Sequence, residues 1–438
     1  MKVILLHLPA LRGLEVEDRT ESLGLGYIAA VLRRDGHEVE ILDALIRGLD
    51  VKSTVHEVVS RDFDCLGITA MHEHRRQLIP IARAIRKQKP HAVIAAGGYL
   101  PTLSAEHLLG ACPEIDFIVR GEGETVASDV FGRIARGENW SDCPGIAFMK
   151  DGAAVLNPLP PAVQDLDSLP FPVHDAMIEA GNMSSVLIYS SRGCYHHCSF
   201  CSINSFYALS GNHAPRFRSP GNVVDEMEQA LAATGVSHFK FCDDDFIGPG
   251  EKTRRRAVQI AEEIRARKLK LTFSLECRAD EVDEDILKAL KEAGLTGVFL
   301  GIESGIQRQL DTFDKGITVE QNRRAIEIVR SLDLHMQPGF IPFDPYTTLD
   351  ELAANMQFTR ETQLWGGTDG HLPMKMTLYP GVPLIEKVRA DGLLRDNGME
   401  YDYAFKDRSI SMVWHALNAW SSTAKFIRGL KKQKRANG

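Results

Sequence analysis

The chain has 438 residues, of which 44% are hydrophobic and 25% are charged, as in ordinary folded proteins. Its formal net charge of -8 argues against a nucleic-acid-binding protein, whose contact surface would be basic. No apolar run approaches the ~18 residues that a membrane-spanning helix needs. The short apolar run at the start meets Pro9 and Arg12 too early for an export signal. We therefore expect a cytoplasmic chain of two or three domains.

The first 145 residues alternate short apolar runs with helical patterns. Strands are expected at residues 3–6, 39–42, 65–69, 92–96 and 115–119, and helices at 23–34, 55–60 and 78–87. This alternation predicts a doubly wound, Rossmann-like α/β domain with a parallel sheet. Ligands of such sheets lie beyond the carboxyl ends of the strands.

The strand ends in this domain are small or rich in glycine, so a large flat or phosphate-bearing ligand can approach the backbone. They include Leu23-Gly24, Thr69, Gly97-Gly98 and Gly121-Glu122-Gly123-Glu124. A GxGxxG loop does not follow the first strand, so a nicotinamide or flavin site is not favoured.

Residues 146–184 are expected to form a proline-rich linker, which begins with a hairpin at 146–149 and 153–156. A buried strand is then expected at 186–189, followed by a loop with three cysteines. After the loop, further strands are expected at 238–242, 271–277, 297–305, 335–341 and 372–378, and helices at 223–233, 254–267, 286–293 and 321–332. Residues 185–385 therefore predict a partial (β/α)6 barrel with its site at the carboxyl ends of the strands.

The loop with three cysteines carries the strongest chemical signal. Cys194, Cys198 and Cys201 are spaced by four and three residues, and such grouped thiolates bind a metal or an iron–sulfur cluster. Three ligands on a four-iron cluster leave one iron free to chelate a small molecule. A zinc site with His196 or His197 as the fourth ligand is the alternative. The other five cysteines are isolated and are expected in the core.

The spacing Cys-x3-Cys-x2-Cys, with the aromatic Phe200 before the last cysteine, resembles the signature of the radical S-adenosylmethionine (SAM) enzymes. The resemblance implies that Cys194, Cys198 and Cys201 hold a [4Fe–4S] cluster. It also implies that the open iron binds SAM and that Phe200 lies beside the adenine. His196 matches no ligand role in the family.

Later strand ends supply groups suited to the rest of SAM. Arg278 could pair with its carboxylate, and Glu303 could accept both ribose hydroxyls, with a helix-capping role as the alternative. The run Asp243-Asp244-Asp245 could suggest a divalent-metal site, but the resemblance favours contacts to the SAM amino group. The residues implied in SAM binding are Phe200, Asp243, Asp244, Arg278, Gly301, Glu303 and Ser304.

The first 145 residues resemble the cobalamin-binding domain that precedes the radical SAM core in one large subclass. The Asp-x-His-x-x-Gly motif of many such domains is missing, because Leu45 stands where the axial histidine would be. His72 and His74 are expected to pack against a corrin or lie at the surface, not to ligate cobalt. A sheet that binds no corrinoid is the alternative. The residues implied in cobalamin binding are Leu23, Gly24, Tyr27, Thr69, Gly97, Gly98, Thr102, Gly121, Glu122 and Glu124.

The resemblance implies an enzyme that cleaves SAM to a 5′-deoxyadenosyl radical and transfers a methyl group, through cobalamin, to an unactivated carbon. The substrate would be a small molecule or a peptide, and the electron donor a protein such as flavodoxin or ferredoxin. A radical rearrangement or an oxidative cyclisation is the rival reaction, and a zinc-stabilised binding module is the rival without enzymatic activity. A methylthiotransferase is disfavoured, because residues 1–145 lack a second cysteine triad.

Two further segments are less informative. The loop at 342–348 departs from the family's glycine-rich element, so the resemblance does not identify the substrate. Residues 386–438 are expected to form a helical extension with a basic tail, which has no acidic residue from Arg408 onward. A solvated helix is expected there, with contact to a membrane or a nucleic acid as the alternative.

Overall fold

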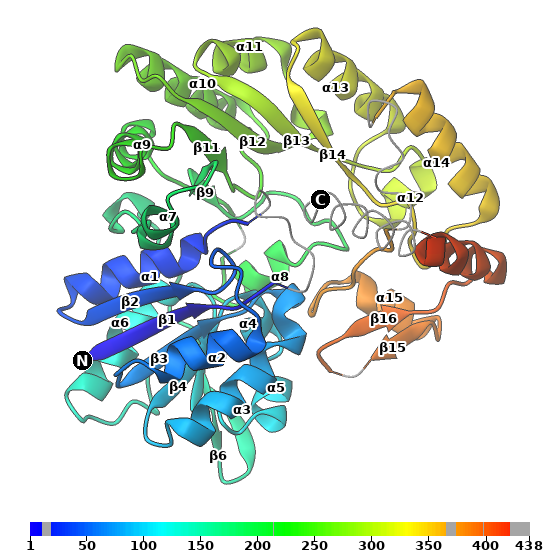
Figure 1. Ribbon diagram of the computed structural model, residues 1–438. Coiled ribbons are helices and arrows are strands. Elements are labelled where there is room, and N and C mark those ends of the chain that lie inside the picture. Colours follow the sequence, from blue (N-terminus) through cyan, green and yellow to red (C-terminus); the bar gives the residue numbers. More distant parts are fainter. Residues whose placement is uncertain (11–18, 213, 365–373, 397, 421–438) are drawn as a thin grey trace, which may run out of the picture.

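The computed structural model describes residues 1–10, 19–212, 214–364, 374–396 and 398–420. Two parallel sheets organise these residues (Figure 1). The N-terminal part of the chain builds one sheet with helices on both faces, and the middle part builds an open arc of strands with helices on its outer side. None of the described helices combines the length and the apolarity that crossing a bilayer requires.

The first sheet has seven strands in the order β2-β1-β3-β4-β5-β6-β7. Its first five strands are parallel, as predicted. Two apolar clusters fill its two faces, one beneath α2 and α3 and the other beneath α1 and α6. The elements are β1 (Lys2–His7), α1 (Leu23–Arg34), β2 (Glu38–Asp43), α2 (Val51–Val59), β3 (Cys65–Thr69), α3 (Leu78–Gln88), β4 (Val93–Gly97), α4 (Tyr99–Leu103), α5 (Ala105–Ala111), β5 (Phe117–Val119), α6 (Gly123–Ala135), β6 (Ile146–Lys150) and β7 (Ala153–Leu156).

The hairpin of β6 and β7 belongs to this sheet and not to the linker in which the sequence placed it. β6 pairs antiparallel with β5, through Phe117 and Phe148 among others. Phe117 and Phe148 both pack near Trp140, so the hairpin completes the apolar core beside the last parallel strand. We propose that the linker begins after Leu156.

The second sheet has five parallel strands in the order β14-β13-β12-β11-β8. Phe239, Phe241 and Phe273 are fully buried between these strands and the outer helices. The predicted sixth strand at 372–378 lies partly outside the described residues; its described part makes one parallel bridge, from Lys375 to Phe343. The elements are α7 (Asp175–Ala180), β8 (Val186–Ile188), β9 (Ser191–Arg192), α8 (Ile203–Ala208), β10 (Arg216–Phe217), α9 (Pro220–Thr234), β11 (His238–Phe241), α10 (Glu251–Ala266), β12 (Thr272–Arg278), η4 (Ala279–Glu281), α11 (Glu284–Glu292), β13 (Leu295–Glu303), α12 (Gln307–Thr312), α13 (Val319–Ser331), β14 (His335–Phe340) and α14 (Leu349–Glu361).

The C-terminal extension is only partly helical. It holds α15 (Leu384–Ala390), an antiparallel pair formed by β15 (Leu394–Asp396) and β16 (Tyr401–Tyr403), and helical residues at 408–420. Tyr403 and Phe405 pack with Phe343 in a separate apolar cluster. Most of the predicted basic tail lies outside the described residues.

A buried ion pair joins the linker to the start of α1. Nδ1 of His174 lies 2.8 Å from Oε1 of Glu21, and both side chains are buried. Burial lowers the pKa of His174, but the hydrogen bond and the charge of Glu21 outweigh it, and the net pKa is raised. The folded state therefore binds the proton of His174 more tightly than the unfolded state does.

The stability that this pair contributes should be fully present below the unfolded histidine pKa of ~6.5 and should be lost as the pH rises through the raised folded value. We expect the free energy of unfolding of the wild-type chain to fall more between pH 6 and pH 9 than that of Glu21→Gln. Urea denaturation at several pH values measures both. Parallel pH dependences for the two proteins would contradict the prediction.

Candidate active site

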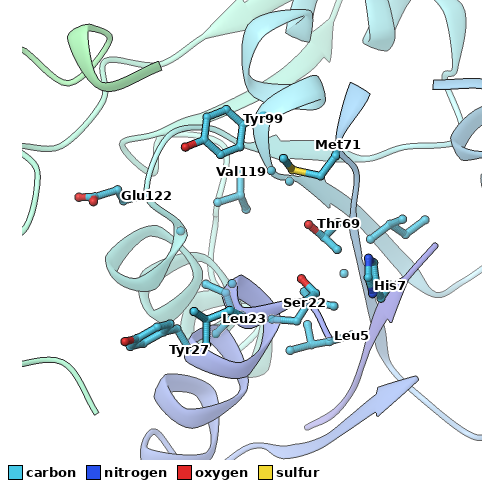
Figure 2. Close-up of a pocket in the computed structure, with 18 of the residues that line it drawn as sticks. Leu5, His7, Ser22, Leu23, Tyr27, Thr69, Met71, Tyr99, Val119 and Glu122 are labelled. Atoms are coloured by element: carbon cyan, nitrogen blue, oxygen red, sulfur yellow. The ribbon is translucent and has the colours of Figure 1, made fainter. Parts of the chain in front are cut away.

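A cavity of about 820 Å³ lies at the carboxyl edge of the first sheet, toward the upper end of the range for ligand sites. Its floor is a row of neighbouring strand ends. His7, Thr69 and Gly97 are register partners on β1, β3 and β4, and all three line the cavity. Figure 2 shows the side chains of His7 and Thr69 beside this space.

The residues predicted to bind cobalamin come together around this cavity. Leu23, Gly24 and Tyr27 line it from α1. With the exception of Thr102, every predicted cobalamin residue lines the cavity: Leu23, Gly24, Tyr27, Thr69, Gly97, Gly98, Gly121, Glu122 and Glu124. Thr102 is buried, and its hydroxyl accepts a hydrogen bond of 3.1 Å from the Gly121 backbone N–H, so its role here is to position the glycine loop.

His7 is a cavity residue that the sequence analysis missed. Its Nδ1 lies 2.9 Å from Oδ2 of Asp43, the register partner on β2, which fixes the orientation of the ring. His74 lies edge-on to His7 with ring centroids 5.5 Å apart. Burial lowers the pKa of His74 to about 4, and its Nδ1 accepts a hydrogen bond from the Met71 backbone N–H. The sequence signal for His7 was its place at the end of the first strand.

The opposite wall of the cavity comes from the second sheet and its loops. Its residues are Leu187, Tyr189, Arg192, Phe206, Tyr207 and Cys242. Tyr99, from the first domain, stacks on Phe206 with ring centroids 4.2 Å apart. The cavity is thus shared between the two halves of the chain, and aromatic rings close one side of it.

Buried ion pairs hold the two halves together at this wall. Nη2 of Arg192 lies 2.6 Å from Oε1 of Glu124, and its Nη1 lies 3.2 Å from Oε1 of Glu122. Arg216, on the paired strand β10, also binds Glu122 at 2.7 Å. Although burial opposes it, the hydrogen bonds from Arg216 and Arg192 lower the pKa of Glu122. Glu122 and Glu124 therefore form ion pairs with arginine side chains in addition to lining the cavity.

Gly24 offers a test of the cavity as a binding site. The residue is exposed on α1, and no atom lies within 4 Å of the position that a Cβ would take. We expect Gly24→Leu to fold, because leucine favours a helix over glycine by up to about 1 kcal/mol. The new side chain should fill part of the cavity and weaken cobalamin binding by about tenfold or more, or about 1.4 kcal/mol.

Equilibrium dialysis against hydroxocobalamin measures this effect. Gly110→Leu is the matched control, since Gly110 also has open space beside it in α5 but lies outside the cavity. Equal cobalamin affinity for Gly24→Leu and Gly110→Leu would show that the ligand does not occupy this space.

The three cysteines of the loop after β9 are free and partly exposed. Burial raises the pKa of Cys194 and of Cys201 to about 12. Burial also raises the pKa of Cys198, although Lys315 and Arg278 oppose it; Nη1 of Arg278 lies 3.4 Å from its Sγ. Binding of a metal or cluster supplies the driving force to ionise such thiols.

Two of the predicted SAM residues face inward. Asp243 is fully buried, and its carboxylate accepts hydrogen bonds from the Ser190 backbone N–H and from the hydroxyls of Ser190 and Ser191. Ser304 is fully buried and hydrogen-bonds Asn355. This geometry favours a positioning role for both over the predicted contact with SAM. Asp244 is partly exposed; it accepts a hydrogen bond of 2.9 Å from the Gly193 backbone N–H, and burial raises its pKa to about 7.

Arg278, Gly301 and Glu303 come together at the carboxyl edge of the second sheet. Arg278 and Gly301 are register partners on β12 and β13. Glu303 has a left-handed backbone with a φ of 58°, a strained conformation of the kind found at functional sites. Its Oε1 binds Nζ of Lys315 at 2.9 Å, so a ribose would share this carboxylate with Lys315. Phe200 packs edge-on against Phe313.

Comparisons with known proteins agree with this arrangement. The family model of the B12 binding domain matches residues 10–131, and that of the radical SAM superfamily matches residues 188–359. This chain is a radical SAM enzyme with a B12-binding domain. Its cofactors are accordingly a [4Fe–4S] cluster, SAM and cobalamin. The glycine-lined cavity and the partly exposed cysteine loop fit these groups.

Two relatives of similar sequence have names that indicate different activities. An uncharacterized methyltransferase of Pyrococcus horikoshii is 28% identical over 376 residues, which cover 85% of this chain and 79% of that protein. An anaerobic magnesium-protoporphyrin IX monomethyl ester cyclase of Rubrivivax gelatinosus is 27% identical over 363 residues, 80% of this chain and 63% of the relative. The chain therefore spans less than two thirds of the cyclase.

Solved structures share the fold over nearly the whole of this radical SAM enzyme. The cobalamin-dependent SAM radical enzyme OxsB superposes with a TM-score of 0.81 at 21% identity, covering 96% of this chain and 66% of that chain. The radical SAM methyltransferase TsrM from Kitasatospora setae gives a TM-score of 0.72 at 20% identity, covering 90% of this chain and 78% of that chain.

Proposed function

We propose that this enzyme is cytoplasmic and that it methylates an unactivated carbon of a small molecule or a peptide, using cobalamin as the methyl carrier and a flavodoxin or a ferredoxin as the electron donor. The main support is the shared wall between the two predicted cofactor sites. Arg192 lines the cavity and stands two residues before Cys194, so the cavity and the cysteine loop are adjacent.

The chain's own residues would bind, orient and seal the reactants. Cys194, Cys198 and Cys201 would hold the cluster, with Asp244, Arg278 and Glu303 around SAM. When bound, these cofactors supply a carbon-centred radical and a transferable methyl group. Aromatic residues such as Tyr99 and Phe206 would exclude water, which matters because a reactive radical is otherwise quenched.

A radical cyclisation or rearrangement is the second candidate, since several relatives are named as cyclases and one as 4'-phospho-dehydrooxetanocin synthase. The two candidates differ in how SAM is used. Methyl transfer needs a second SAM to restore the methyl carrier, whereas a cyclisation does not.

The test uses anaerobically reconstituted protein with hydroxocobalamin, titanium(III) citrate and SAM labelled with ¹³C in its methyl group. Mass spectrometry then measures 5′-deoxyadenosine and the ¹³C content of the extracted corrinoid. Both signals together support methyl transfer. Formation of 5′-deoxyadenosine without label in the corrinoid favours the cyclisation, and absence of both would contradict both candidates.

A further inference from the structure

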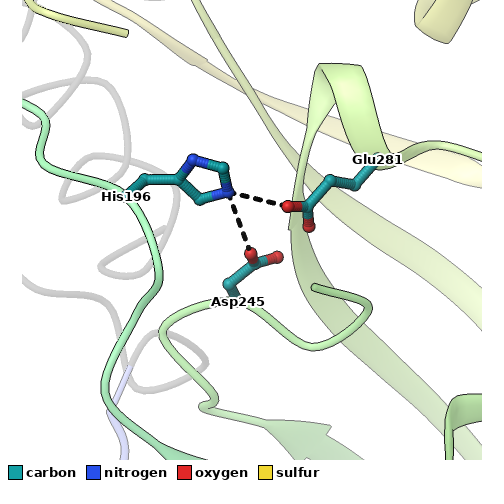
Figure 3. A group of neighbouring side chains, drawn as sticks. All are labelled: His196, Asp245 and Glu281. Carbon is teal, nitrogen blue, oxygen red and sulfur yellow. Dashed lines mark hydrogen bonds and ion pairs between the residues drawn. The ribbon is translucent and has the colours of Figure 1, made fainter. Parts of the chain in front are cut away.

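A group of one imidazole and two carboxyl side chains lies beside the cysteine loop (Figure 3). His196 comes from the loop itself, Asp245 from the loop after β11, and Glu281 from η4 after β12. Nε2 of His196 lies 2.7 Å from Oε1 of Glu281 and 3.8 Å from Oδ2 of Asp245. One ligand atom of each residue lies within 4.8 Å of the other two. Figure 3 shows both carboxylates directed at the imidazole.

The two carboxyl groups are buried, and several of their oxygens lack a hydrogen-bond donor. Asp245 is 4% exposed and Glu281 is 3% exposed. Within the described part of the chain, no N–H or hydroxyl group donates a hydrogen bond to either oxygen of Asp245 or to Oε2 of Glu281. The two carboxyl groups lie within hydrogen-bonding reach of each other, so they have to share a proton or a cation. Buried carboxylate oxygens nearly always have a partner, because leaving them unpaired is costly. The three unpaired oxygens therefore point to a ligand.

The charges around the group indicate that this ligand is a cation. Two nearby guanidinium groups are directed elsewhere: Arg278 binds Asp280 at 3.0 Å, and Arg256 donates hydrogen bonds to Ser190 and to the Phe246 carbonyl. The site itself holds two carboxyl groups and one imidazole. A divalent cation would balance two carboxylates beside a neutral histidine.

We propose that His196, Asp245 and Glu281 bind a first-row divalent metal ion, separate from the [4Fe–4S] cluster. An imidazole with two carboxylates is a ligand set for zinc, iron or manganese and unlike the three thiolates of the cluster. With bonds of ~2.1 Å, tetrahedral ligand atoms lie ~3.4 Å apart. The two separations from Nε2 of His196, 2.7 and 3.8 Å, bracket that value, and the third separation is within 4.8 Å, so side-chain shifts of about 1 Å would close the site.

The position of the ion gives it a role. His196 stands between Cys194 and Cys198, whereas Asp245 and Glu281 follow strands of the second sheet. An ion bound to all three residues ties the cysteine loop to that sheet and so fixes the direction of the loop. Three protein ligands also leave at least one position open for water or for a group of the substrate.

Manganese is the suitable probe, because Mn²⁺ prefers oxygen and nitrogen ligands to thiolates. The experiment titrates cluster-loaded, oxidised protein with Mn²⁺ in the absence of SAM and follows the six-line electron paramagnetic resonance signal of the free ion. We expect one tightly bound Mn²⁺ per chain, which Zn²⁺ displaces. The affinity should fall at least tenfold in Asp245→Asn and in Glu281→Gln.

The control Glu284→Gln changes an exposed carboxylate close by on α11 and should leave Mn²⁺ binding unchanged. Circular dichroism shows whether each variant is folded, and His196→Gln provides a third variant if one of the others is not. Wild-type binding no stronger than that of Asp245→Asn would overturn the proposal. So would weaker SAM binding by Asp245→Asn without any Mn²⁺ binding by the wild type, since the carboxylates would then await the SAM ammonium group.

Discussion

Replacing Cys198 with alanine is expected to abolish the formation of 5′-deoxyadenosine from SAM. Cys198 is the middle cysteine of the triad, and Arg278 lies 3.4 Å from its Sγ. A cluster with two protein ligands in place of three would be lost or would no longer present its open iron to SAM. Liquid chromatography with mass spectrometry of reduced, anaerobically reconstituted protein measures the product, and iron analysis measures the cluster.

The matched control is Cys112→Ala. Cys112 is a buried cysteine of the first domain, with no exposed surface, and its loss should leave the iron content unchanged. If Cys198→Ala still forms 5′-deoxyadenosine at the rate of Cys112→Ala, the triad is not the cluster ligand set.

Much of the fold was predictable because its strands are buried on both faces and therefore appear as continuous apolar runs. The strand at 65–69 and the helix at 23–34 match β3 and α1 residue for residue. α2 begins at Val51, earlier than predicted, because the Asp50 side chain caps it by accepting a hydrogen bond from the Ser53 backbone N–H. A cap of this kind determines a helix start without any apolar residue.

Two of the helices that the sequence analysis did not predict, α6 and α14, were missed for the same reason. α6 begins at Gly123, inside the glycine loop that was assigned to ligand binding. α14 begins at Leu349, directly after the N-cap Thr348, whose side chain forms a capping box with Glu351 in the first turn. The sequence analysis considered this segment only for its departure from the family's loop. In both cases the functional signal of the loop hid the helix that follows it.

The candidate site was predictable where its residues share a local motif. The cysteine spacing and the glycine loops are short patterns, and the structure brings the cobalamin residues around one cavity. Contacts between distant segments were not predictable. His7 owes its place to register with Thr69 on another strand, and Arg192 owes its partners to the packing of the two domains.

Arg192→Met is expected to cause a large loss of stability, because the ion pairs of Arg192 are buried. Arg192 is 8% exposed and Glu124 is 6% exposed, and Arg192 also lies over the ring of Tyr27 at 5.1 Å. Removing the guanidinium leaves the Glu124 carboxylate buried without its cation, a change that costs about 3–5 kcal/mol. We expect the free energy of unfolding to fall by this amount, and urea denaturation of the cobalamin-free chain measures it.

The double variant Arg192→Met with Glu124→Gln separates pairing from packing. If the buried charge causes the loss, Glu124→Gln should recover part of it, and the two single effects will not add. Arg267→Met is the control, because Arg267 binds Asp225 at 2.6 Å but that partner is 53% exposed, and exposed pairs contribute about 0–1 kcal/mol. Equal losses for Arg192→Met and Arg267→Met would show that burial at the domain boundary does not strengthen the pair.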